Sequence, residues 1–313
     1  MATEPTNKPA QQKAKGSLLP RTITGVLFVV AIVACFVLHP LAYAILFALI
    51  SGLTTWEFCS LLNQHAGAHI NRVIVTVSSV YFFFAVLAFN MNTASAGIFI
   101  PYLISLIYLL ISELYLNSDS TLHNWAYAFM AQGYVALPFA LLNPLAFTVI
   151  HQDGLVGVGY NWLFPLGVFI FLWTNDTGAY CIGSLLGRHR LFPRISPKKS
   201  WEGSIGGAVL TLIASQIIAF LTLPQVGDSL AAATSTPYLR HALVWGGLAV
   251  VVVLFGTWGD LVESLLKRKL GVKDSGIILP GHGGMLDRFD SALLAIPAAV
   301  IYIYTLQTLG FGT

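Results

Sequence analysis

The stretch from Lys267 to Asp290 brings together residue types that act on phosphates. It packs eight charged residues of both signs into 24 positions, whereas charged residues make up only 9% of the whole chain. A glycine-rich run, residues 281–284, lies between these charges. Carboxylates suit a hard cation such as Mg²⁺, lysine and arginine bind phosphate oxygens, and glycines let backbone N–H groups turn toward an anion. The stretch therefore predicts a site for a metal ion and a polyphosphate.

Carboxylates inside apolar segments extend this predicted site. A charged side chain in a membrane costs about 2.5–3.5 kcal/mol on insertion scales, so each one needs a reason. Asp176 and Asp260 lie about 15 Å and about 9 Å from the inner ends of their predicted helices. Asp287 and Asp290 are three residues apart where the last predicted helix begins, so they share a face. If these carboxylates meet in one cavity, they repel one another unless a cation lies between them.

Helical spacing adds a polar stripe to the segment before the charged stretch. Asp260, Glu263, Ser264 and Lys267 follow one another at i, i+3, i+4 and i+7. A purely structural interpretation stays open for each acid: Asp287 and Asp290 would complement a helix N-terminus, and Glu263 or Asp290 would pair with an arginine. That interpretation does not explain why acids, cations and glycines gather on one side of the protein.

The elements that position these residues are apolar helices. Hydrophobic residues make up 56% of the chain and its mean hydropathy is +0.76. A membrane-spanning helix needs about 20 apolar residues, and such runs recur throughout. The sequence therefore predicts an all-α polytopic membrane protein without extended strands. About nine helices are expected, the fifth kinked by Pro138 and Pro144, at 22–38, 41–62, 73–89, 97–115, 125–150, 162–186, 205–223, 242–266 and 289–309.

The chain divides into three predicted regions. Residues 1–21 form a polar, disordered cytoplasmic tail, 22–161 the N-terminal transmembrane helices and 162–313 the transmembrane region that carries the predicted site. This last region has cytoplasmic loops at 187–204 and 267–288. The first helix is expected to be retained rather than cleaved as a signal peptide. The three cysteines have no paired spacing and predict neither a disulfide framework nor a zinc site.

Basic residues predict the orientation. With the N-terminus in the cytoplasm, 15 of the 16 lysines and arginines fall in inner segments, and only Arg240 lies outside. The acids of the predicted site lie toward the same side. We therefore expect the active site at the cytoplasmic face.

The charged stretch belongs to a longer motif. The segment 264–290 resembles the signature of the CDP-diacylglycerol synthases, also called phosphatidate cytidylyltransferases. The matching positions are Ser264, Leu266, Lys267, Arg268, Lys273, Asp274, Gly276, Leu279, Pro280, His282, Gly283, Gly284, Met285, Asp287, Arg288, Phe289 and Asp290. The blocks "NDTGAY" at 175–180 and "SPKKSWEG" at 196–203 are also similar to blocks of this family. The likeness runs from about residue 162 to residue 310.

This resemblance implies an integral membrane nucleotidyltransferase of phospholipid biosynthesis. It implies that CTP and phosphatidate are the substrates, that CDP-diacylglycerol and pyrophosphate are the products, and that Mg²⁺ is required, with K⁺ beside it in the family. It also implies contact with membrane lipids, a homodimer, a bacterial cytoplasmic (inner) membrane location and no nucleic-acid partner.

The resemblance assigns roles to individual residues. It implies that three acids hold the metal: Asp260, Asp287 and Asp290. Together with these acids, Lys267, Arg268 and Arg288 are the expected catalytic residues, Arg288 as a clamp for the lipid phosphate. The expected substrate- and nucleotide-binding residues are Asn175, Asp176, Ser196, Lys198, Lys199, Lys273, His282, Gly283 and Gly284. His282 would either donate to a phosphate or only shape the turn.

Other functions fit parts of this pattern. A secondary transporter would use Asp176 and Asp260 as ion sites, but such sites usually lie near the midplane with access from both sides. A CTP-dependent lipid kinase would transfer the γ-phosphate and release CDP. A structural membrane protein would leave the charge cluster unexplained. Glu57 and Glu113 are expected to reach the headgroup region by snorkelling and receive no role.

Overall fold

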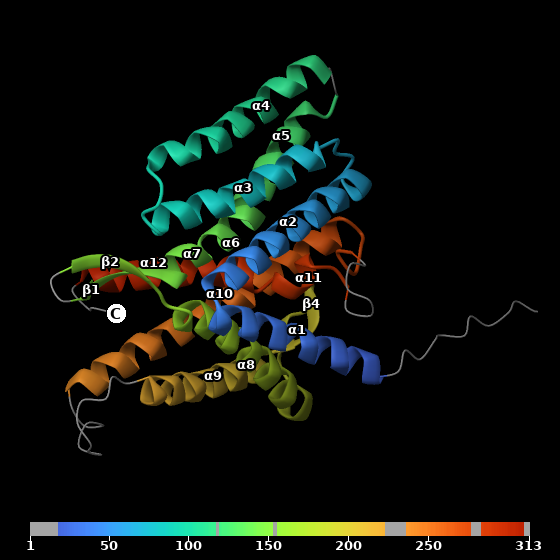
Figure 1. Cartoon of the computed structure of the whole chain (residues 1–313). Coiled ribbons are helices and arrows are strands. Elements are labelled where there is room, and N and C mark those ends of the chain that lie inside the picture. The colour runs from blue at the N-terminus through green and yellow to red at the C-terminus, as the bar shows by residue number, and fades with distance from the viewer. Residues whose placement is uncertain (1–17, 117–118, 153–154, 223–235, 277–282, 310–313) are drawn as a thin grey trace, which may run out of the picture.

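The computed structural model describes residues 18–116, 119–152, 155–222, 236–276 and 283–309, and most of these are helical (Figure 1). The α-helices are α1 (Leu18–Leu38), α2 (Pro40–His65), α3 (Arg72–Asn90), α4 (Ile100–Leu116), α5 (Thr121–Met130), α6 (Leu137–Ala140), α7 (Leu142–Ala146), α8 (Leu163–Leu186), α9 (Trp201–Leu221), α10 (Thr236–Lys269), α11 (Leu286–Phe289) and α12 (Ala292–Thr308). A 3₁₀ turn, η1 (Ala96–Phe99), precedes α4, and a π-helical turn, η2 (Ala131–Ala136), joins α5 to α6.

Seven segments in the described part of the chain are long and apolar enough to cross a membrane, by length and composition. They are Pro40–His65, Arg72–Asn90, Ala96–Leu116, Thr121–Ala146, Trp201–Leu221, Tyr238–Lys269 and Leu286–Thr308. This agrees with the predicted all-α membrane protein. The two other predicted spans correspond to α1 and to α8, and α8 carries the polar pair Asn175–Asp176 in its middle. The count of nine spans stays a prediction.

Local sequence explains where several helices begin. Pro40 opens α2, where its missing N–H costs nothing, and the His39 Nδ1 accepts a 3.0 Å hydrogen bond from the Leu41 N–H. Ser200 precedes α9, and its hydroxyl accepts a 3.2 Å bond from the Gly203 N–H. The beginning of α9 is therefore fixed beside the lysines that precede it.

Glycines allow α8 and α9 to pack with their backbones close together (Figure 1). A methyl group added at Gly178 would lie 3.0 Å from the Gly207 Cα, and one added at Gly203 would lie 2.8 Å from the Ala179 carbonyl oxygen. Side chains at these positions would force the helices apart. This close contact holds Asn175 and Asp176 on α8 opposite the first turns of α9.

Two short antiparallel hairpins contradict the expectation that no strands form. The strands β1 (Phe147–Gln152) and β2 (Leu155–Tyr160) pair with each other, as do β3 (Arg190–Phe192) and β4 (Ser196–Ser200). The predicted fifth helix, 125–150, is therefore wrong at its end. It is broken by η2 and by the prolines of α6 and α7, and it turns into a strand at Phe147.

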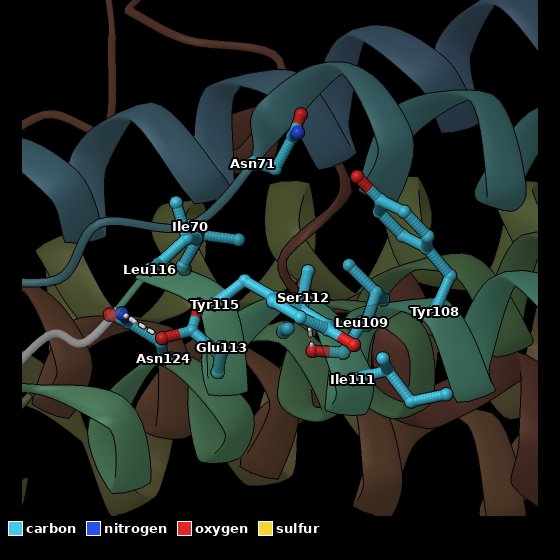
Figure 2. A pocket seen from close by; sticks show the side chains of 11 residues that line it. Ile70, Asn71, Tyr108, Leu109, Ile111, Ser112, Glu113, Tyr115, Leu116 and Asn124 are labelled. Carbon is cyan, nitrogen blue, oxygen red and sulfur yellow. Dashed lines mark hydrogen bonds between the residues drawn. The ribbon is translucent and has the colours of Figure 1, made fainter.

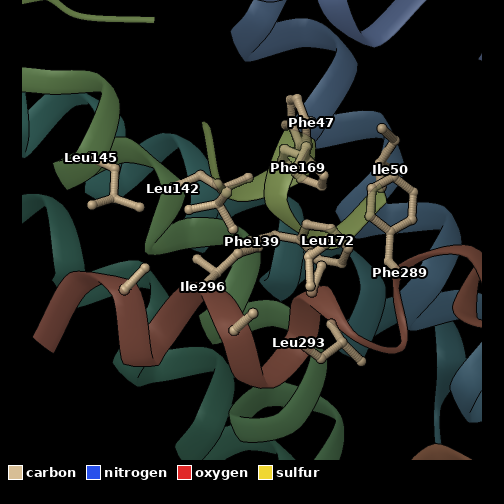
Figure 3. Packing of buried hydrophobic residues seen from close by; sticks show 14 of the residues in the cluster. Phe47, Ile50, Phe139, Leu142, Leu145, Phe169, Leu172, Phe289, Leu293 and Ile296 are labelled. Atoms are coloured by element: carbon tan, nitrogen blue, oxygen red, sulfur yellow. The ribbon is translucent and has the colours of Figure 1, made fainter. Parts of the chain in front are cut away.

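The core joins both halves of the chain around Phe289 of α11. This ring packs edge to face on Phe139 of α6 and on Phe169 of α8, with centroid distances of 5.4 and 6.0 Å (Figure 3). It also contacts Phe47 of α2 at 6.5 Å and Phe28 of α1 at 5.7 Å. Phe289 lies between Arg288 and Asp290 in the sequence, so the core fixes the backbone of the predicted site.

We expect Phe289→Leu to lower the free energy of unfolding by about 1–2 kcal/mol, because aliphatic packing is kept while four aromatic contacts are lost. Thermal unfolding of the purified protein measures this. Phe220→Leu changes an exposed ring of α9 and is the control. Equal melting temperatures for both variants would contradict the anchoring role.

Candidate active site

A cavity of about 560 Å³ opens between α8, the β3–β4 hairpin, the first turn of α9 and α10. It is within the range of small-ligand sites. Its lining residues are Asn175, Asp176, Ala179, Tyr180, Gly183, Ser184, Gly187, Arg190, Lys198, Lys199, Ser200, Gly203, Ser204, Thr257 and Asp260. Five of these, Asn175, Asp176, Lys198, Lys199 and Asp260, are predicted site residues. The sequence-distant blocks therefore meet in one place.

The positive side of the cavity is formed by the approach to α9. Lys198 and Lys199 lie in β4, which ends at Ser200, and α9 begins at the next residue, Trp201. A helix N-terminus carries a partial positive charge. At α9 the Trp201 N–H donates to the His189 carbonyl oxygen and the Gly203 N–H to the Ser200 hydroxyl, so the helix offers this charge rather than free donors. Together with Arg190, this arrangement suits the oxygens of a polyphosphate. The sequence predicts nucleotide binding by Lys198 and Lys199, and it predicts backbone binding of an anion at the glycine run 281–284.

The negative side is formed by α8 and α10. The Lys199 ammonium forms an ion pair with the Asp260 Oδ2, and the Ser264 hydroxyl donates a 3.1 Å bond to the Asp260 Oδ1. Asp176 lies within electrostatic range of both Lys199 and Asp260. One lysine therefore pairs with one carboxylate, Asp260, and lies within electrostatic range of a second, Asp176.

Asp290 lies beside this group at the junction of α11 and α12. Its carbonyl oxygen would be only 2.7 Å from a methyl group added at Gly259, so α10 and this junction touch next to Asp260. The Ser291 N–H donates a 2.5 Å bond to the Asp290 Oδ1. Asp290 interacts electrostatically with Asp260 and Asp176, and carboxylates this close repel one another.

A second ionic group lies around Lys267 of α10. Its ammonium is 2.5 Å from the Glu263 Oε2, one helical turn away, and 2.7 Å from the Asp287 Oδ1. The Glu263 side chain is fully buried. The Asp287 Oδ2 accepts 2.9 Å bonds from the N–H groups of Ser275 and Gly284. Asp287 therefore ties the signature segment to α10.

Glu57 of α2 is a functional candidate that sequence analysis missed. Its side chain is 4% exposed, so the expectation that it snorkels to the headgroups is wrong, and the same holds for Glu113 at 7%. The Glu57 Oε2 accepts a 2.8 Å bond from the Met285 N–H, and its Oε1 accepts bonds from the Leu286 N–H and the Ser275 hydroxyl. An acid inside an apolar run was the available indication.

Glycines of the signature make room for these bonds. Gly283 has a φ of +82°, in the left-handed region that favours glycine. A methyl group at Gly284 would overlap the Glu57 carboxylate and the Ser275 hydroxyl, and one at Gly276 would lie 2.7 Å from the Glu57 Cδ. The glycines thus allow the backbone to approach buried carboxylates.

Other predicted site residues lie away from the cavity. The Arg268 Nε donates to the Ile195 carbonyl oxygen at 3.5 Å, which links α10 to the β3–β4 hairpin. Ser196 pairs with Phe192 in that hairpin. Lys273 and Arg288 are exposed, and His282 lies outside the described residues.

The site is also a reasonable place for a cation. Within the described residues, no three Asp, Glu, His or Cys side chains already stand close enough to enclose a metal ion. Mg²⁺ usually needs only one or two carboxylates because waters and substrate phosphates complete its shell. Asp260, which lines the cavity, and Asp290, which lies next to α10 but is not among the lining residues, supply such a pair. Buried oxygens on α8 and α10, among them the Asn175 Oδ1 and the Glu263 Oε1, have no hydrogen-bond partner in the described structure. The residues present fit a hard cation.

Comparison with known proteins points to the same class of chemistry. The Cytidylyltransferase family matches residues 19–306. The chain is 35% identical over 260 residues to a phosphatidate cytidylyltransferase of Staphylococcus haemolyticus, which covers 80% of this chain and 89% of the relative. It is 36% identical over 223 residues to a phosphatidate cytidylyltransferase of Staphylococcus saprophyticus, which covers 63% of this chain and 77% of the relative.

Proposed function

Because the chain belongs to the Cytidylyltransferase family, we propose that it is a phosphatidate cytidylyltransferase, which converts CTP and phosphatidate into CDP-diacylglycerol and pyrophosphate. The observation that carries this proposal is the cavity itself. Basic side chains and a helix N-terminus line one wall, and the acids Asp176 and Asp260 line the other. That combination suits a nucleoside triphosphate bound with a cation.

The reaction needs neutralisation of charge more than a strong base. The phosphate of phosphatidate is already an anion at neutral pH, and its oxygen forms a bond to the α-phosphorus of CTP. The bond between the α-phosphorus and the bridging oxygen to the β-phosphate breaks, and pyrophosphate leaves with that electron pair. The main obstacle is to bring two anions together, so positioning and electrostatic stabilisation dominate catalysis.

Different residues bind the triphosphate and the cation. Lys198, Lys199, Arg190 and the first turn of α9 hold the triphosphate. Asp260 and Asp290 are the residues that would hold Mg²⁺. The third acid of the predicted set, Asp287, is bound to Lys267 and to the Ser275 and Gly284 N–H groups. When bound, Mg²⁺ neutralises phosphate charge and stabilises the departing pyrophosphate. K⁺ beside it belongs to the same proposal.

Lys267 and Arg288 have different proposed roles. Lys267 keeps Asp287 and Glu263 in place through the ion pairs described above. Arg288, at the surface of the junction, is suited to clamp the lipid phosphate through two parallel N–H bonds.

The proposal includes a membrane arrangement. We place nine spans with the N-terminus and the cavity on the cytoplasmic side of a bacterial inner membrane, as the distribution of basic residues favours. Phosphatidate would then enter sideways from the inner leaflet. A homodimer is part of the same expectation.

We expect Lys199→Ala to raise the KM for CTP about tenfold or more and to change the KM for phosphatidate far less, because a charge-assisted bond to the triphosphate is lost. Steady-state kinetics with each substrate varied in turn measures this. Lys269→Ala removes an exposed basic residue outside the cavity and is the control. An unchanged CTP dependence in Lys199→Ala would remove Lys199 from the nucleotide site.

The products test the proposed reaction directly. Purified protein is incubated with phosphatidate, Mg²⁺ and CTP labelled in the cytosine ring, and the lipid is then extracted. We expect the label in the lipid phase and unlabelled pyrophosphate in the water phase. Labelled CDP in the water phase, with phosphate added to the lipid, would show a lipid kinase instead.

A further inference from the structure

A second pocket of about 310 Å³ lies between residues 70–71, just before α3, the C-terminal half of α4, and α5 (Figure 2). It shares no lining residue with the active-site cavity. Most of its lining is apolar and includes Ile70, Leu109 and Ile111. One ionisable carboxylate, Glu113 of α4, faces this apolar space. Nothing in the cytidylyl-transfer reaction uses this residue.

Glu113 is held in place from a different helix. The Asn124 Nδ2 of α5 donates a 2.9 Å bond to the Glu113 Oε2, which is drawn as a dashed line in Figure 2. The Asn124 Oδ1 accepts a 2.8 Å bond from the His69 N–H, which fixes the amide orientation. Glu113 and Asn124 are 7% and 2% exposed. The carboxylate is therefore buried, oriented and hydrogen-bonded to a neutral amide.

The charge of Glu113 sets the chemistry of an occupant. In the described part of the chain, no lysine, arginine or histidine forms an ion pair with it. A buried carboxylate is costly unless a cation or several donors compensate it. A single carboxylate is a poor site for a divalent metal ion, which prefers six or more oxygen ligands or substrate phosphates. An organic ammonium fits better, because it pairs with the carboxylate while its carbon chain contacts the apolar lining.

The position of the pocket favours a membrane lipid as the source of this ammonium. The pocket lies in the candidate membrane span Ala96–Leu116, next to its C-terminal end. The lining residues Tyr108, Ile111, Tyr115 and Leu116 are themselves exposed, at 46%, 45%, 84% and 62%. Exposed apolar side chains on a membrane span face lipid. The mouth of the pocket is therefore accessible from the bilayer.

We propose that this pocket binds the primary ammonium headgroup of a membrane phospholipid, with Glu113 as the counter-ion and Asn124 as the residue that orients it. Such a site lies apart from the substrate cavity and takes a lipid other than phosphatidate, which has no ammonium. The occupancy of this site therefore depends on how much of the surrounding lipid carries a primary ammonium headgroup. A quaternary ammonium lacks N–H donors and binds less well.

Native mass spectrometry of the delipidated protein tests this site. Dioleoyl phosphatidylethanolamine, phosphatidylcholine and phosphatidylglycerol are titrated separately, and bound lipid is counted. We expect the ethanolamine lipid to bind most tightly, and Glu113→Gln to weaken its binding about tenfold while phosphatidylglycerol binding stays the same. Asp119→Asn removes an exposed carboxylate just after the same helix and should change nothing.

A pocket-filling variant and a competition experiment complete the test. Ser112→Leu fills the pocket while keeping Glu113, so it should also weaken binding, and it replaces Glu113→Gln if that variant does not fold. Free ethanolamine should compete only weakly with the lipid. Equal binding of the three lipids, full binding by Glu113→Gln, or full displacement by free ethanolamine would overturn the proposal.

Discussion

Replacing Asp290 by asparagine is expected to lower the turnover number about a thousandfold without unfolding the protein. Asp290 and Asp260 are the carboxylate pair proposed to hold the cation, and loss of one charge weakens stabilisation of the departing pyrophosphate. Folding should not suffer, because Asp290 is repelled by Asp260 and Asp176 and an amide removes that repulsion. The melting temperature should therefore stay the same or rise.

Turnover with saturating CTP and phosphatidate, together with thermal unfolding, measures both effects. The matched control is Asp119→Asn, an exposed position in the turn between α4 and α5. Activity of Asp290→Asn close to that of the control would show that Asp290 is not part of the catalytic centre. A large fall in melting temperature would show a structural role instead.

Glu57→Ala is expected to lower the free energy of unfolding by about 3–5 kcal/mol and to abolish activity. The change leaves the buried N–H groups of Met285 and Leu286 and the Ser275 hydroxyl without their acceptor. Each unsatisfied buried donor costs about 1–3 kcal/mol. The segment released in this way also carries Asp287, so the loss reaches the active site.

Glu57→Gln separates the two consequences. It keeps the carbonyl acceptor but turns an amide NH₂ toward a donor, so we expect an intermediate loss of stability. Thermal unfolding and product formation are measured for both variants. A melting temperature and turnover of Glu57→Ala equal to those of the unchanged protein would contradict the link between α2 and the signature segment.

The charged residues of the site could be predicted because apolar membrane segments rarely contain charged side chains. A charged residue in a membrane helix needs a partner, and Asp176, Asp260 and Lys199 do meet in one cavity. The same rule applied to Glu57, but its role could not be deduced. Its partners are two backbone N–H groups and a serine more than 200 residues away, and these leave no charge pattern in the sequence.

The β1–β2 hairpin was not predictable for a different reason. A short apolar run such as residues 147–150 has the same composition in a buried helix and in a strand, so periodicity cannot separate them. Arg268 lay in the signature next to Lys267, yet it faces the β3–β4 hairpin because neighbouring helical positions point in different directions. Spacing predicted which residues share a face, but not which neighbour that face meets.

Binding of Mn²⁺ in place of Mg²⁺, followed by electron paramagnetic resonance with CTP present, tests most directly whether the carboxylates of α10 and the α11–α12 junction hold the cation that binds the nucleotide. We predict one tightly bound Mn²⁺ with coupling to ³¹P nuclei of the triphosphate, and loss of both in Asp260→Asn and Asp290→Asn. The same Mn²⁺ affinity and ³¹P coupling in those variants would contradict the proposed catalytic centre.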